Sequence, residues 1–130
     1  MFPAPLAILL SGRGSNFLAL QGAIERGELP ARIALVISNL EGVPGIEKAR
    51  ELGLATAVIA HRGEPDRSAH ETKIAAAVEK SGAEWICLAG YLRLLSPSFV
   101  ARWPRRILNI HPSLLPAFPG LHPQRQALAH

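Results

Sequence analysis

The 130-residue sequence lacks the features that mark secreted, membrane-bound or disordered proteins. Its single cysteine, Cys87, excludes an internal disulfide framework and is typical of a reducing compartment. No apolar run reaches the roughly 18 residues that a membrane-spanning helix needs. The first ten residues contain neither a basic segment nor a small-residue cleavage site, so we expect no signal peptide. These absences predict a cytoplasmic protein.

The positive charge is also not gathered into one patch. The formal net charge is +4 at pH 7, and Arg105-Arg106 is the only adjacent basic pair. Aromatic residues do not alternate with basic ones, as they do in many nucleic-acid-binding surfaces. We therefore expect a generally basic surface, with some arginines available to an anionic small molecule, and no nucleic-acid partner.

What the chain does contain is an alternation of apolar runs and helically spaced apolar residues, in a composition that is 48% hydrophobic and 18% charged. Strands are expected over 6–10, 33–38, 55–60, 85–89 and 107–110. Helices are expected between them, with a further one opening at 124–130, and Ser68 with Glu71 could form a capping box. This order predicts a single α/β domain over residues 1–130, an open and mostly parallel sheet with helices on both faces.

The most informative segment is residues 108–116, Leu-Asn-Ile-His-Pro-Ser-Leu-Leu-Pro. Asn109 and His111 are two apart at the end of an expected strand, so their side chains should project to the same side. Open α/β sheets place their ligands at this end. A carboxamide beside an imidazole suits a reaction that moves one proton and stabilises one oxyanion, although a lone histidine can also be structural.

A glycine loop, Ser-Gly-Arg-Gly-Ser-Asn at residues 11–16, follows the first expected strand. Glycines let backbone N–H groups approach a phosphate, and the start of the next helix adds partial positive charge. The candidate phosphate ligands are Gly14, Ser15 and Asn16. The loop matches neither the Walker nor the dinucleotide motif. The alternative is a tight strand-to-helix turn with Ser15 as the N-cap.

A third segment, residues 90–97, follows the fourth expected strand with the sequence Gly-Tyr-Leu-Arg-Leu-Leu-Ser-Pro. Its leucines and Arg93 would suit a flat heteroaromatic ligand with a polar edge. The alternative is a hydrophobic loop packed on the core, with Arg93 in solvent. No metal is expected, because the histidines have no carboxylate cluster or cysteine pair beside them. There is no Gly-x-Ser-x-Gly nucleophile motif, and Cys87 is expected to be buried and inert.

Taken in order, these segments resemble the phosphoribosylglycinamide formyltransferases, folate-dependent enzymes of purine synthesis. The resemblance rests on residues 11–16, 89–97 and 109–116, with Phe-Pro-Gly-Leu-His at 118–122 and Arg-Gln-Ala-Leu at 125–128. It covers essentially the whole chain. Taken by itself, the Asn-x-His-Pro-Ser-Leu-Leu-Pro element is shared, with variations, by folate formyltransferases and formyl-hydrolases generally. The glycine loop and the Phe-Pro-Gly-Leu-His continuation narrow the resemblance to the glycinamide ribonucleotide branch. The resemblance implies a Rossmann-like formyltransferase fold.

The resemblance implies transfer of a formyl group from 10-formyltetrahydrofolate, as co-substrate, to the amine of 5-phosphoribosylglycinamide. Gly14, Ser15 and Asn16 would hold the nucleotide phosphate. His111 would be the proton donor and Asn109 would help to bind the oxyanion. The folate site would comprise Arg67, Leu92, Arg93, Leu94, Leu95 and Asn109. His122 and Arg125 are secondary candidates for placing the substrate or supporting the site.

Members of this family continue into a strand opening His-Gly-x-Ser/Thr and a loop whose aspartate orients the histidine. The sequence ends at His130, so the resemblance implies an N-terminal fragment or a truncated variant. Without that carboxylate, His111 should be a weaker acid at neutral pH. Two alternatives stay open beside the transferase: a 10-formyltetrahydrofolate hydrolase, and a non-catalytic module that binds only phosphate.

Overall fold

The computed structural model describes residues 3–110, and in this range five strands form one parallel sheet in the order β3-β2-β1-β4-β5. The strands are β1 (Ala4–Leu10), β2 (Ala31–Ser38), β3 (Thr56–Val58), β4 (Trp85–Leu88) and β5 (Ile107–Asn109). The helices are α1 (Ser15–Glu25), α2 (Pro44–Glu51), α3 (Arg67–Ser81) and α4 (Pro97–Ala101). The α/β fold with a parallel sheet is confirmed.

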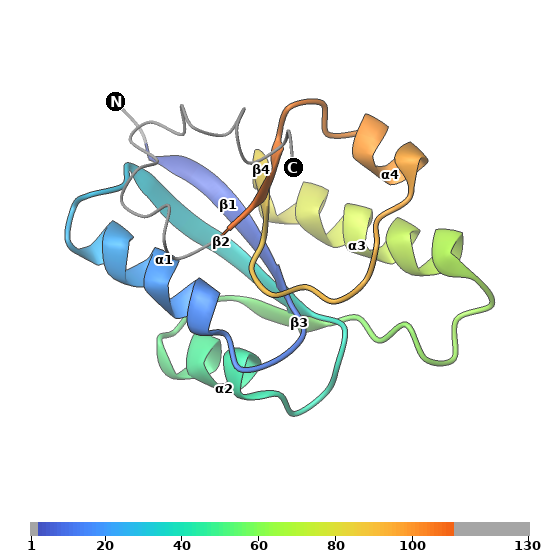
Figure 1. Cartoon of the computed structure of the whole chain (residues 1–130), viewed down its shortest axis with the longest axis horizontal. Helices are drawn as coiled ribbons and strands as arrows, with labels where there is room; N and C mark the ends of the chain where they lie inside the picture. Colours follow the sequence, from blue (N-terminus) through green and yellow to red (C-terminus); the bar gives the residue numbers. More distant parts are fainter. Residues whose placement is uncertain (1–2, 111–130) are drawn as a thin grey trace.

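Helices cover both faces of the sheet because the central strand β1 is apolar on both of its sides (Figure 1). Leu6, Ile8 and Leu10 belong to the core that contains residues of α1 and α2. Ala7 and Leu9, which alternate with them, belong to the core that contains residues of α3 and α4. None of the helices in residues 3–110 has the length and apolar character to cross a membrane.

Two local predictions were wrong. The N-cap of α3 is Asp66, whose side chain accepts a hydrogen bond from the N–H of Ala69 at 2.8 Å. Ser68 lies inside the helix, and Glu71 is buried with its carboxylate directed to α4 instead of to a capping box. The second correction concerns α1, whose N-cap is Gly14 rather than Ser15. The helix expected at 124–130 lies outside the described residues.

The parallel strands direct their carboxyl ends to one edge of the sheet, so the loops that follow them meet there. One backbone hydrogen bond shows this directly: the N–H of Ser11, after β1, donates to the carbonyl of Gly90, after β4, at 3.2 Å. The glycine loop and the segment after β4 are therefore neighbours, although about 80 residues separate them in the sequence.

Candidate active site

The glycine loop between β1 and α1 has a backbone conformation that requires glycine. Gly14 has a φ of 82°, in the left-handed region that other residues rarely adopt. A Cβ placed on Gly14 would lie 2.7 Å from the Cα of Gly45, the second residue of α2. The N-cap residue supplies no side-chain cap to α1. The first N–H groups of this helix, at Ser15 and Asn16, therefore suit an anionic ligand.

The segment after β4, residues 91–95, lies beside the glycine loop. The N–H of Leu92 donates to the hydroxyl oxygen of Ser11 at 2.9 Å. Leu92 and Leu94 are 81% and 82% exposed, whereas Arg93 and Leu95 are half-buried. The alternative of a loop packed on the core is therefore wrong for these two leucines, which offer an apolar surface to a ligand.

The far end of segment 91–95 is held by a buried carboxylate. Glu71 of α3 accepts a hydrogen bond from the N–H of Ser96 at 2.8 Å and another from the Ser96 hydroxyl. Arg67 precedes Glu71 by one helical turn and is exposed at the start of α3. The resemblance assigned Arg67 and the loop after β4 to one folate site. In the structure, the first turns of α3, which carry Arg67, lie at the end of this loop.

Asn109 is the last residue of β5 and is exposed between the buried residues Leu108 and Ile110. Its Cα is paired with that of Leu88 at the end of β4, two residues before Gly90. The amide of Asn109 therefore belongs to the same sheet edge as the two loops. The predicted residues His111, His122 and Arg125 lie outside the described residues.

A polar cluster that the sequence analysis missed lies under this edge. The hydroxyl of Ser11 donates to Asn39 Oδ1 at 2.6 Å, and Asn39 Nδ2 lies 3.4 Å from Nδ1 of His61. Ser11 and Asn39 are buried. Burial together with the positive charges of Arg93, His70 and Arg62 lowers the pKa of His61. The only signal in the sequence was the polar pair Ser38-Asn39 at the end of an apolar strand.

Two other titratable groups are fixed in their neutral forms. The pKa of the Tyr91 phenol is raised to about 12, mainly by burial; nearby Arg93 opposes this shift and Glu71 contributes to it. Burial also raises the pKa of the Cys87 thiol to about 12, in agreement with the prediction of a buried, inert cysteine. Neither group is ionised at neutral pH.

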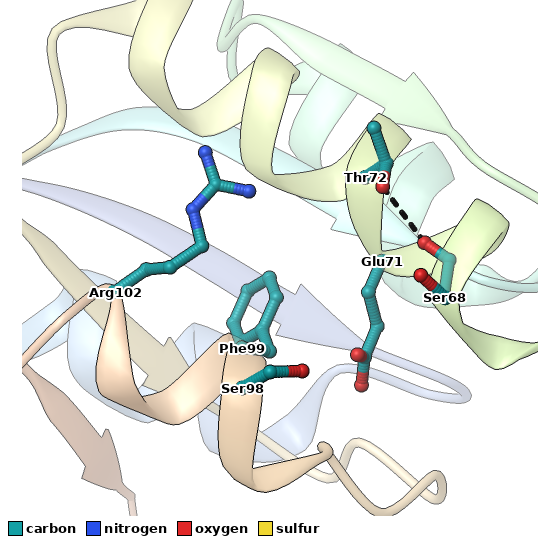
Figure 2. A pocket seen from close by; sticks show the side chains of 6 residues that line it. All are labelled: Ser68, Glu71, Thr72, Ser98, Phe99 and Arg102. Carbon is teal, nitrogen blue, oxygen red and sulfur yellow. Dashed lines mark hydrogen bonds between the residues drawn. The ribbon is translucent and has the colours of Figure 1, made fainter.

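A pocket of about 170 Å³ lies between α3 and α4, away from the glycine loop (Figure 2). It is lined by Ser68, Glu71, Thr72, Ser98, Phe99 and Arg102. Its cation is already paired, since the guanidinium of Arg102 lies 3.2 Å from the carboxylate of Glu79. The Thr72 hydroxyl likewise donates to the Ser68 carbonyl at 2.8 Å. The pocket therefore marks the junction of two helices, and we place the candidate site at the sheet edge.

Within residues 3–110, no group of three or more histidine, cysteine, aspartate or glutamate side chains could hold a metal ion.

Comparison with known proteins decides the family. Residues 4–130 match the model of the formyl transferase family. The chain belongs to this family. It is 47% identical over 125 residues to a trifunctional purine biosynthetic protein adenosine-3 of Drosophila pseudoobscura pseudoobscura, covering 95% of this chain and 9% of that protein. It is 38% identical over 123 residues to the phosphoribosylglycinamide formyltransferase of Escherichia coli K12, covering 95% of this chain and 58% of that protein.

Solved structures of the family have the same architecture. The crystal structure of glycinamide ribonucleotide transformylase 1 from Symbiobacterium toebii superimposes with a TM-score of 0.79 and 41% sequence identity. That match covers 98% of this chain and 60% of the other. The chain thus spans little more than half the length of these single-function relatives, and its Rossmann-like formyl transferase fold is confirmed.

Proposed function

We propose that the chain carries the nucleotide half and part of the folate half of a formyl transferase site. The reaction is transfer of a formyl group from 10-formyltetrahydrofolate to the amine of 5-phosphoribosylglycinamide, in purine biosynthesis. One observation carries the proposal. The glycine loop before α1, the exposed leucines after β4 and the amide of Asn109 meet at one sheet edge, in a chain of the formyl transferase family.

The nucleotide phosphate would bind at the start of α1. The left-handed Gly14 turns the chain so that the N–H groups of Ser15 and Asn16 begin the helix, where the helix dipole favours an anion. Ser15 is exposed and can add its hydroxyl to the contact. This phosphate site needs no basic side chain, because backbone N–H groups supply the hydrogen bonds.

The folate would bind across segment 91–95. Leu92 and Leu94 would cover the flat face of its ring, while the half-buried Arg93 and Leu95 would border it. Arg67, at the start of α3, is a cation for the glutamate carboxylates of a folate. Asn109 would reach the formyl end from β5.

In the reaction, the amine nitrogen of the nucleotide attacks the formyl carbon and forms a new C–N bond. The formyl oxygen becomes an oxyanion, to which the Asn109 amide would donate a hydrogen bond. The attacking nitrogen loses a proton, N10 of the folate gains one, and the C–N10 bond breaks. His111 would exchange these protons, a role worth about 10²–10⁴-fold in rate. His122 and Arg125 would place the substrate or support the site.

We further propose that residues 1–130 form one N-terminal formyl transferase domain and that the protein is cytoplasmic. The continuous five-stranded sheet in residues 3–110 supports a single unit. The buried, unpaired thiol of Cys87 is typical of proteins in a reducing compartment.

The decisive experiment measures formyl transfer by two proteins. One is the 130-residue chain, and the other is the same chain extended with the C-terminal part of the Escherichia coli relative, here called the extended chain. We expect formylated nucleotide from the extended chain. His111→Ala should lower its turnover by about 10²-fold or more and leave nucleotide affinity unchanged. A folded but inactive extended chain would refute the proposal.

The same assay separates the alternatives. A hydrolase would release tetrahydrofolate without added 5-phosphoribosylglycinamide, whereas a transferase depends on it. A non-catalytic module would bind the nucleotide in calorimetry and turn over neither substrate. Equal loss of turnover and nucleotide affinity in His111→Ala would assign His111 a structural role.

A further inference from the structure

A chain of side-chain hydrogen bonds crosses the carboxyl ends of three neighbouring strands. Ser11 follows β1 directly, Asn39 follows β2 directly, and His61 comes three residues after β3. Ser11 and Asn39 are each 3% exposed, so neither can contact a ligand. The chain ends on the backbone of Leu92, the first exposed leucine of the proposed folate loop.

The direction of every hydrogen bond in this chain is fixed. The N–H of Leu92 can only donate, so it occupies a lone pair of the Ser11 hydroxyl. The carbonyl oxygen Oδ1 of Asn39 can only accept, so the Ser11 hydroxyl donates its hydrogen to it. The Asn39 amide is thereby oriented with Nδ2 toward Nδ1 of His61, which must accept. A neutral His61 with its proton on Nε2 satisfies this arrangement.

The charges around His61 favour that neutral form. Arg93 from the loop after β4, His70 from α3 and Arg62 from the segment after β3 all disfavour a positive charge on it. The rings of His61 and His70 meet edge to face with centroids 6.1 Å apart, and Nε2 of His70 is bonded to the carbonyl of Ile59 at 2.6 Å. The acceptor end of the hydrogen-bond chain thus lies among groups from three segments that disfavour its protonation.

Resting on the proposed function, we propose that Asn39 is a positioning residue for folate binding. It orients the Ser11 hydroxyl so that this oxygen holds the Leu92 N–H, while Glu71 holds the other end of the loop at Ser96. Held at both ends, the loop keeps Leu92 and Leu94 exposed for the ligand. Without these anchors, the leucines would turn toward the apolar core, because burial of their side chains lowers the free energy.

The test compares Asn39→Ala with Ser38→Ala in the extended chain. Ser38 is a matched control because it is the buried last residue of β2, next to Asn39. Within residues 3–110, its hydroxyl forms hydrogen bonds only with the backbone of Leu40. We expect Asn39→Ala to raise the KM for 10-formyltetrahydrofolate about fivefold and to leave kcat little changed. A fivefold change is the size expected from the loss of one hydrogen bond. Ser38→Ala should leave this KM unchanged.

A second variant, Asn39→Asp, is tested by the pH dependence of its KM for folate. A purely structural role of Asn39 would not change this pH dependence. In Asn39→Asp, both oxygens of the new side chain accept, so a protonated His61 becomes the better partner. The folate KM of this variant should fall as the pH is lowered through the pKa of His61. In the parent protein it should rise over the same range, because Nδ1–H would then face Nδ2–H.

Amide hydrogen exchange of the ligand-free 130-residue chain reports on the loop and needs no activity assay. The Leu92 amide should exchange faster in Asn39→Ala than in Ser38→Ala. If the extended parent chain turns over and Asn39→Ala keeps its folate KM, the positioning role is wrong and the proposed function stands. If the folded parent has no turnover, the proposed function fails and the exchange data alone cannot rescue the role. Parallel pH profiles of parent and Asn39→Asp would also overturn the inference.

Discussion

The two loops that meet at the carboxyl edge of the sheet are built in opposite ways. The glycine loop after β1 is shaped by its backbone: Gly14 is left-handed, and Gly45 approaches so closely that its N–H donates to the Gly12 carbonyl at 3.0 Å. The loop after β4 is held by side chains, Ser11 at its start and Glu71 at its end. One loop therefore depends on the absence of side chains and the other on their presence.

This difference fits the ligands proposed for each loop. A phosphate is recognised by N–H groups at close range, so a loop without Cβ atoms suits it. A flat heteroaromatic ring is recognised by apolar area and shape, which two exposed leucines supply. Substitutions should therefore act on the two loops by different routes: steric strain in the first and lost hydrogen bonds in the second.

The largest effect is expected from Gly14→Ala. The new Cβ would lie 2.7 Å from the Cα of Gly45 at a φ of 82°, so both the turn and the contact with α2 must shift. We expect the free energy of unfolding to fall by about 3 kcal/mol and nucleotide affinity to be lost. Urea denaturation and calorimetry with 5-phosphoribosylglycinamide measure the two effects.

The matched control for Gly14→Ala is Gly12→Ala in the same loop. A Cβ on Gly12 would meet no atom within 4 Å, and its backbone is not left-handed. Its stability should change by about 0.5 kcal/mol or less. Equal effects of the two substitutions would show that the backbone does not set this loop.

The next effect is expected at the other loop, from Glu71→Ala. This change removes the acceptor of both the Ser96 N–H and its hydroxyl, and we expect a loss of about 2 kcal/mol in the free energy of unfolding. Glu71→Gln keeps one acceptor oxygen and should lose less. Glu79→Ala, which removes only an exposed ion pair with Arg102, should cost about 0.5 kcal/mol or less. A large loss in Glu79→Ala would refute this ranking.

Glu71 also shows which parts of the structure the sequence could predict. Local patterns were sufficient for the elements: the apolar runs predicted the five strands found in residues 3–110, with helices between them. A capping box is also a local pattern, but Glu71 is occupied by a residue 25 positions away. Such a long-range contact leaves no periodic signal. Sequence spacing alone therefore predicted the wrong hydrogen-bond partner for its carboxylate.

The candidate site was predictable to the extent that motifs carry its chemistry. The glycine loop and the apolar loop each follow a strand, Asn109 ends one, and parallel topology alone brings such segments to one edge. The network of Ser11, Asn39 and His61 was not predictable, because it joins three single residues from three loops. Its members resemble ordinary polar loop residues until the fold brings them together.

A smaller effect is expected from Leu94→Ser. The side chain is 82% exposed, so its loss should change the free energy of unfolding by about 0.5 kcal/mol or less. In the extended chain the KM for 10-formyltetrahydrofolate should rise about fivefold, because apolar contact area with the ring is lost. Leu52→Ser, at the exposed end of α2, is the control and should leave this KM unchanged. A strong loss of stability in Leu94→Ser would instead indicate that the loop packs on the core.

The smallest expected effect is the shift in the pKa of His61. Its titration distinguishes the loop after β1 from the loop after β4 and needs no ligand. Burial and the charges of Arg93, His70 and Arg62 lower its pKa below the ordinary 6.5, so NMR of the 130-residue chain should find the midpoint below that value. Because the unfolded chain takes up this proton more readily, the contribution of His61 to stability is complete above 6.5 and is lost as the pH falls through the folded pKa.

Arg93→Gln should raise the pKa of His61 toward 6.5, since it removes a positive charge from the loop after β4. The amide signal of Leu92 should follow the same titration, because the hydrogen-bond chain connects it to His61 through Asn39 and Ser11. The amide signal of Gly14 should not follow it, since that loop is set by backbone geometry. A midpoint at or above 6.5, or a Leu92 signal that ignores it, would show that the two loops do not differ in this way.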